Sequence, residues 1–219
     1  MDGLNILKNI NSPILKLKIR FKKKILKLKG VIMNLTKKAL SQALKELMSH
    51  IEFDKITISD VTKEAGVSRN TFYYHFSDIN HLLEWTYDNE IVNELATYGN
   101  LETWKDGLLS VFNYTEKNRK FCLNTFHSLS RDRLESFLYR ISHDMLISIM
   151  SKRYSSDRLS ESLKLDIADF YGRAIVAQVV HWLKNRLIEP KDQVIARIER
   201  ATTGMIDLIV GNQTYRSDN

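Results

Sequence analysis

The sequence has few of the residues that tight turns need, with only 8 glycines and 2 prolines among 219 residues. Sheet proteins use both residue types in the turns between strands, so this shortage favours a chain of helices. The single cysteine, Cys122, excludes an internal disulfide and a multi-cysteine zinc site, and suits a reducing cytoplasm. Because Cys122 lies between Phe121 and Leu123, we expect it to be a small core residue. No apolar run reaches the 18 residues of a membrane-spanning helix.

The positive charge of the chain lies almost entirely at one end. The net charge is +7, but residues 1–32 hold nine basic side chains and one acidic side chain. From Met33 onward, 24 basic and 25 acidic residues nearly cancel. The basic balance is therefore no argument that the remainder of the chain binds nucleic acid.

Three interpretations of residues 1–32 compete. The stretch "PILKLKIRFKKKILKLKGVIM" has no apolar run long enough for a signal peptide. It can be a disordered basic arm that grips phosphates. It can also be a membrane-surface segment, although apolar and basic residues alternate from Leu15 to Phe21 and would leave a helix without an apolar face. A third interpretation, which we favour, is an untranslated leader with the start at Met33. Of the 32 residues, 24 belong to types that have codons built only from A and T, as the translation of an AT-rich bacterial leader would give. In addition, a DNA sequence that encodes Lys29–Met33 can contain a ribosome-binding site before a start codon at Met33. The genomic DNA tests this interpretation, because the absence of a purine-rich, AGGAG-like stretch before the Met33 codon would refute it.

A packing helix and two short helices are predicted next. Apolar residues recur every three to four positions over Asn34–Ile51, which predicts one amphipathic helix. Thr57 with Asp60 forms a capping box that opens a short helix, and Gly66 is placed to end it. Ser68 can cap the second short helix. Two short helices joined around a glycine after a packing helix are typical of a helix-turn-helix.

The rest of the chain predicts more helix, so the expected fold class is all-α. Ser77 or Asp78 can cap a longer helix over Ile79–Ala96. The further expected helices are Leu101–Thr115, Arg119–Ser128, Asp132–Tyr154, Ser160–Asn185 and Pro190–Val210. We therefore expect a basic extension at 1–32, an N-terminal three-helix helix-turn-helix DNA-binding domain at 33–80, and a helical regulatory and dimerisation domain at 81–219.

The stretch "GVSRNTFYYHF" divides into a buried face and an outward face. With 100° per residue, Phe72 and Phe76 share one side, whereas Asn70 and Tyr74 lie about 160° from its centre. Arg69 is long enough to reach round to the outward face. Arginine can pair with guanine and asparagine with adenine in a major groove, while tyrosine and threonine hydroxyls suit phosphates.

The segment "TISDVTKEAGVSRNTFYYHFSDINHLLE" resembles the DNA-binding segment of the TetR family of bacterial transcriptional regulators. The family pattern runs T-[IV]-x-D-[IV]-x-x-x-A-G-V-S-x-x-T-x-Y-x-[HY]-F-x-x-K-x-x-L. The matching residues are Thr57, Asp60, Val61, Ala65, Gly66, Val67, Ser68, Thr71, Tyr73, His75, Phe76 and Leu82. Asn70 stands where the family often has glycine, and Ile79 where it commonly has a lysine that reaches a phosphate. A weaker C-terminal similarity, around Gly172 and Trp182-Leu183, points to a Firmicutes-type subgroup that includes regulators of dihydroxyacetone kinase operons.

The resemblance implies a cytoplasmic homodimer whose two C-terminal helices, Ser160–Asn185 and Pro190–Val210, form a four-helix interface. Its partners would be a double-stranded DNA operator and an unknown effector, either a small molecule or a protein. The expected DNA-contacting residues are Thr57, Ser59, Ser68, Arg69, Asn70, Thr71, Tyr73, Tyr74 and His75. The expected effector-pocket residues are Trp104, Phe112, Phe126, Phe137, Tyr139, Met145 and Phe170.

We expect no enzymatic activity, no cofactor and no metal site. His127, His143 and His181 lack metal-ligand spacing, and no nucleophile or phosphate-loop motif occurs. The alternative function from another class is a helical protein-interaction module, or a co-regulated activator whose effector is a partner protein.

Overall fold

A computed structural model describes residues 13–92, 104–156, 158–202, 204 and 208–209. The elements in these ranges are α2 (Pro13–Leu47), η2 (Phe53–Lys55), α3 (Ile58–Glu64), α4 (Arg69–His75), α5 (Ile79–Tyr87), the π-helical turn η3 (Asp88–Val92), α7 (Trp104–Lys117), α8 (Arg119–Phe126), α9 (Arg131–Arg153), α10 (Glu161–Lys184) and α11 (Lys191–Thr202). Every regular element in the described ranges is helical, which confirms the all-α prediction.

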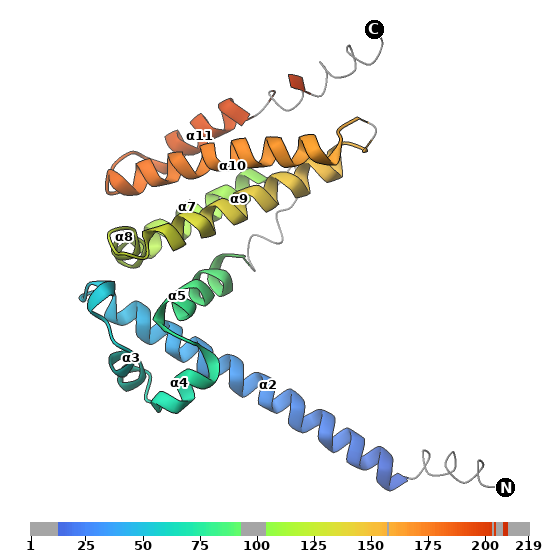
Figure 1. Ribbon diagram of the computed structural model, residues 1–219, viewed down its shortest axis with the longest axis vertical. Helices are drawn as coiled ribbons and strands as arrows, with labels where there is room; N and C mark the ends of the chain where they lie inside the picture. Colours follow the sequence, from blue (N-terminus) through green and yellow to red (C-terminus); the bar gives the residue numbers. More distant parts are fainter. Residues whose placement is uncertain (1–12, 93–103, 157, 203, 205–207, 210–219) are drawn as a thin grey trace, which may run out of the picture.

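The N-terminal helices pack around the apolar face of α2. The periodic apolar residues of α2 point onto α3, α4 and α5, which lie against its C-terminal half (Figure 1). The most deeply buried side chains of this core are Leu40, Leu44, Val61, Phe72, Phe76, Leu82 and Leu83. Helices α3 and α4 have seven residues each, and helices this short are unstable alone. The burial of these apolar side chains therefore holds them in place.

The C-terminal helices form a separate layer. Helices α9 and α10 run side by side, and α7 lies behind them (Figure 1). Helix α8 lies at the end of the layer where α9 begins, and α11 lies on the side of α10 away from α9. The rings of Phe112 and Trp182 lie 4.6 Å apart in this core, and the indole nitrogen of Trp182 donates to the carbonyl oxygen of Glu189 at 2.8 Å. Cys122 is also buried, as predicted.

The first long helix was predicted wrongly in its bounds. It begins at Pro13 instead of Asn34 and ends at Leu47 instead of Ile51. Pro13 occupies the first helical position, where its missing N–H costs nothing, and the lysines and leucines that follow are strong helix formers. Residues 13–32 are therefore helical rather than disordered, and this part of α2 projects beyond the other elements (Figure 1).

The helix predicted over Ile79–Ala96 also differs. Asp78 caps α5, which ends at Tyr87, and the π-helical turn η3 continues to Val92. Ala96 lies outside the described residues. No described helix is long and apolar enough to cross a membrane.

Candidate DNA-binding site

The turn between α3 and α4 is built from the capping residues that the sequence predicts. The backbone N–H of Thr57 donates to Oδ2 of Asp60 at 2.9 Å, and the backbone N–H of Asp60 donates to the hydroxyl of Thr57 at 3.2 Å. The hydroxyl of Thr57 also donates to Oδ2 of Asp60 at 2.6 Å, and this bond, followed by the one from the Thr57 backbone N–H, lowers the pKa of the Asp60 carboxyl. Gly66 adopts a positive φ of 66°, and Ser68 accepts a hydrogen bond from the backbone N–H of Thr71 at 3.1 Å. The capping box, the glycine stop and the second cap are all confirmed.

One side of helix α4 is buried in the core, and the opposite side is exposed. Phe72 is fully buried and Phe76 is 1% exposed, whereas Tyr73 is 52% exposed and Tyr74 is 72% exposed. Asn70 is exposed on the outward side. Exposed large aromatic side chains beside a planar amide form a surface that can reach base edges and phosphates in a major groove.

Four of the other predicted contacts are exposed around the starts of the two short helices. Thr57, Ser59, Ser68 and Arg69 are exposed, and Thr71 is half-buried. Nη1 of Arg69 donates to Oγ of Ser59 at 3.4 Å, so α3 and α4 present these polar groups together. The structure thus places the predicted residues on α3, on α4 and at the starts of both helices.

His75 differs from the others, because it is half-buried. Its Nδ1 atom is buried without a hydrogen-bond partner among the described residues. Desolvation and, secondarily, the Lys37 ammonium lower the pKa of His75 below its ordinary 6.5. Its ring lies edge-on to Tyr74, with centroids 4.9 Å apart. His75 therefore supports the position of Tyr74, and its own polar surface is limited.

One contact with the outward face was not predicted. The hydroxyl of Tyr74 lies 3.9 Å from the sulfur of Met33 on α2. The projecting part of α2 thus starts next to the outward face of α4.

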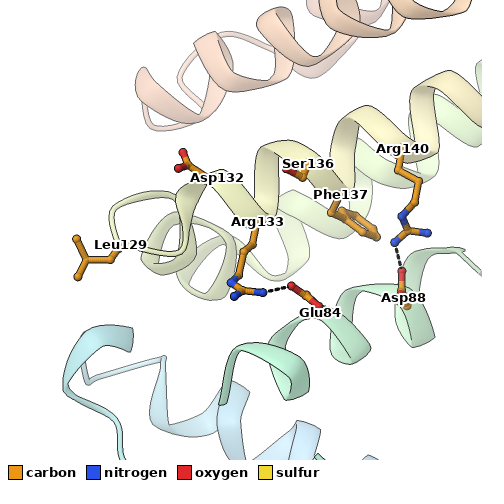
Figure 2. Close-up of a pocket in the computed structure, with 8 residues that line it drawn as sticks. All are labelled: Glu84, Asp88, Leu129, Asp132, Arg133, Ser136, Phe137 and Arg140. Carbon is orange, nitrogen blue, oxygen red and sulfur yellow. Dashed lines mark hydrogen bonds and ion pairs between the residues drawn. The ribbon is translucent and has the colours of Figure 1, made fainter. Parts of the chain in front are cut away.

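A polar seam joins these N-terminal helices to the C-terminal layer, and sequence analysis did not identify it. Arg133 on α9 forms an ion pair with Glu84 of α5, and Arg140, two turns further along α9, forms one with Asp88 of η3 (Figure 2). The open cleft at this seam has a volume of about 630 Å³ and is lined by Glu84, Asp88, Leu129, Asp132, Arg133, Ser136, Phe137 and Arg140. The spacing of Glu84 and Asp88 by four residues was the available signal, since it places both carboxylates on one helix face.

A second part of the seam centres on Glu90 in η3. Nζ of Lys45 and the hydroxyl of Tyr114 both donate to Oε2 of Glu90, each at 2.7 Å. Burial and this carboxylate raise the pKa of the Tyr114 phenol, which stays protonated and able to donate. Three elements, α2, η3 and α7, meet at this point.

The residues expected to line an effector pocket are placed apart. Phe112, Phe126 and Phe137 are buried in the core, the Tyr139 hydroxyl donates to Asp169 at 2.6 Å, Met145 lines a small cavity, Phe170 is 69% exposed, and the side chain of Trp104 lies outside the described residues. Two interior cavities that described residues line measure about 20 and 10 Å³. Each has room for about one water molecule. Among the six whose side chains are described, Met145 lines the first of these cavities and Phe137 lines the second.

The described residues contain no group of three or more histidine, cysteine or acidic side chains that could hold a metal ion.

Comparisons with known families match both parts of the chain. Residues 40–85 match the family described as "Bacterial regulatory proteins, tetR family", and residues 102–204 match "Transcriptional regulator C-terminal region". The first range contains α3, α4 and almost all of α5, and the second contains α7–α11.

Two curated relatives are similar to parts of the chain. The HTH-type dhaKLM operon transcriptional activator DhaS of Lactococcus lactis subsp. lactis (strain IL1403) is 28% identical over 92 residues, which are 42% of this chain and 49% of the relative. The match therefore spans about half the length of that relative. The uncharacterized HTH-type transcriptional regulator YvdT of Bacillus subtilis (strain 168) is 27% identical over 133 residues, 56% of this chain and 69% of the relative.

Two solved structures share the fold. The dihydroxyacetone kinase operon activator DhaS superposes with a TM-score of 0.62 at 23% identity, over 79% of this chain and 97% of that chain. The second structure is NalD, the secondary repressor of the MexAB-OprM multidrug efflux pump in Pseudomonas aeruginosa. It superposes with a TM-score of 0.52 at 14% identity, over 77% of this chain and 94% of that chain.

Proposed function

The chain belongs to the TetR family of bacterial regulatory proteins and is a DNA-binding transcriptional regulator, and we propose that it acts as a homodimer on a pseudo-palindromic operator. In this proposal residues 33–80 bind DNA, and residues 81–219 dimerise and respond to an effector. Two recognition helices would enter successive major grooves about 34–36 Å apart. A protein that binds chromosomal DNA in this way would act in the cytoplasm.

The outward face of α4 is the observation that carries this proposal. Arg69, Asn70, Tyr73 and Tyr74 are exposed on a helix whose opposite side is anchored by Phe72. We propose that Arg69 and Asn70 read base edges, and that the tyrosine hydroxyls contact phosphates. Thr57, Ser59, Ser68, Thr71 and His75 complete the proposed surface, the hydroxyls near phosphates and His75 as support.

Exposed apolar side chains on α10 support dimerisation. Leu165 is 53% exposed and Phe170 is 69% exposed, and Ala174 and Ala177 are exposed on the following turns. At 100° per residue, Phe170, Ala174 and Ala177 fall within about 60° of one another and form one exposed apolar face, whereas Leu165 lies about 140° from Phe170. An exposed apolar face on a helix is typical of a protein interface. We propose that α10 and α11 pair with their copies in a second chain, as the helices Ser160–Asn185 and Pro190–Val210 are expected to do.

Two kinds of effector remain in the proposal. A small molecule in the interior of the C-terminal domain needs more room than the described cavities of about 20 and 10 Å³ offer, whereas one in the open cleft of about 630 Å³ does not. A partner protein bound on the surface requires no interior cavity. The Lactococcus relative is named a transcriptional activator, so activation as well as repression is a possible outcome of operator binding.

A genomic footprint of the purified protein tests the proposal. We expect protection of a two-fold symmetric site, including DNA near its own gene, that survives excess competitor DNA, and a dimeric mass in sedimentation. A protein-interaction module would give no sequence-specific footprint at any concentration. Strong binding of a single half-site by a monomer would instead refute the dimeric arrangement.

A further inference from the structure

Asn124 on α8 joins the C-terminal bundle to the end of α2 through three hydrogen bonds. Its Nδ2 atom donates to the carbonyl oxygens of Met48 at 2.8 Å and Ile51 at 2.6 Å. Its Oδ1 atom accepts a hydrogen bond from the backbone N–H of Phe53 at 2.8 Å. The partners lie 71 to 76 residues before Asn124 in the chain.

The chemistry of these three contacts requires a side-chain amide. The carbonyls at the end of a helix have no partner within the helix. Met48 follows directly after α2, and Ile51 lies at the end of the turn that follows it. An asparagine amide offers two donors and one acceptor, which match two carbonyls and one N–H. An aspartate of the same shape would accept from Phe53 but would place a carboxylate against both carbonyls. Asn124 therefore caps α2 from another domain.

A second contact lies beside the first. The backbone N–H of Leu129, after α8, donates to both carboxylate oxygens of Asp54 at 3.3 and 3.1 Å. The loop between α2 and α3 is thus held before η2 and within it. The apolar face of α2 packs on α3, α4 and α5, so the position of its end fixes the recognition helix relative to the bundle.

Apolar packing, such as that of Tyr87 on Phe137, also joins this region to α9, but the two ion pairs to α9 are weaker by their nature. The pairs Arg133–Glu84 and Arg140–Asp88 have side chains 45% to 48% exposed. Exposed ion pairs contribute little and are screened by salt. A neutral amide with three partners is not screened, so it can hold one geometry more closely.

We propose that Asn124 is a positioning residue for operator recognition, setting the half-site spacing that the dimer accepts. This inference rests on the proposed homodimer. A change of one base pair moves a half-site by about 3.4 Å and rotates it by roughly 35° around the duplex. A rigidly attached DNA-binding domain discriminates strongly against both changes, whereas a loosely attached domain follows the half-site and discriminates less.

The test compares the affinity of the full chain for three duplexes: the operator selected by the wild-type protein, and the same operator with one central base pair inserted or removed. Asn124→Asp and Asn124→Ala remove the donors with and without an added charge. Asn118→Asp is the matched control, because Nδ2 of Asn118, at the start of the same helix, donates to the Tyr114 carbonyl at 2.9 Å within the bundle. Active concentrations come from stoichiometric titration with the selected operator.

We expect both Asn124 variants to lower the ratio of affinities between the selected and altered spacings by about tenfold, the effect of one or two lost hydrogen bonds. The ratio for Asn118→Asp should equal that of the wild type. A merely destabilising change scales all three affinities together and leaves the ratio unaltered, so an unchanged ratio in folded Asn124→Ala overturns the inference. An equal fall in Asn118→Asp overturns it as well. A wild-type protein without any spacing preference would refute the dimeric operator itself, and this inference with it.

Discussion

Replacing Asn70 by alanine tests whether the outward face of α4 reads bases. Asn70 is the second residue of α4, it is exposed, and the structure gives its side chain no hydrogen bond among the described residues. Alanine is the better helix former by up to about 0.7 kcal/mol. The folded protein should therefore keep or slightly gain stability, so any loss of DNA affinity arises at the interface.

The magnitude follows from the geometry of a bidentate contact. An asparagine that pairs with adenine discriminates against other bases by about 1–3 kcal/mol, which is roughly 5- to 150-fold. A symmetric dimer makes the contact twice. On a full operator with both adenines changed, the wild type should lose about 25-fold to 20,000-fold in affinity. Asn70→Ala should show almost no difference between the two operators.

The assay measures the affinities of both proteins for operators that carry each substitution in turn, in both half-sites. We expect Asn70→Ala to relax the preference at one position only. Because no charge is removed, the slope of affinity against salt concentration should not change. A variant with an unchanged preference at every position would show that Asn70 does not read a base.

Four further predictions concern residues of the same region and of the core. Tyr73→Phe removes one hydroxyl, so affinity for operator and random duplexes should fall by a similar factor, up to about tenfold; a loss confined to the operator would assign Tyr73 to base recognition instead. Gly66→Ala should lower the free energy of unfolding in urea by about 1 kcal/mol, because the φ of 66° strains alanine while its added methyl group meets nothing within 4 Å; no change would mean that the turn relaxes. Burial lowers the pKa of His75, so below about pH 6.5 the histidine is protonated in the unfolded chain before it is protonated in the native state. Proton binding then favours the unfolded chain. Stability should fall over that range, and His75→Phe should reduce the fall; identical pH profiles would contradict this. Burial raises the pKa of the Cys122 thiol to about 12, so iodoacetamide at pH 8 should label it rapidly only in denaturant; equally fast labelling of the native protein would contradict the burial.

Local chemistry explains why the helix-turn-helix could be predicted. The capping box of Thr57 and Asp60, the positive φ of Gly66 and the cap at Ser68 each depend on neighbours within a few residues. The burial of Phe72 and the exposure of Tyr74 follow from helical periodicity and one amphipathic neighbour. These features are encoded in segments short enough to be read without knowing the rest of the fold.

The N-terminal part of α2 shows the limit of periodicity. Its alternating lysines and leucines offer no single apolar face, so the pattern gave no sign of a helix. The strong helix formers after Pro13 nevertheless extend α2 backward from the folded part, and a helix that is already nucleated can be extended at low cost.

What the sequence determined by itself was therefore the outward surface of the helix pair: which residues form α3 and α4, where each helix begins, and which side of α4 faces outward. Only the tertiary structure decided how that surface is attached. The hydrogen bonds of Asn124 to Met48 and Phe53, like the ion pair between Arg133 and Glu84, join residues that are 49 to 76 positions apart. No local pattern records such pairs, because they depend on how the layers pack. The small interior cavities have the same cause, since aromatic residues fill a core or line a pocket according to how closely their helices approach.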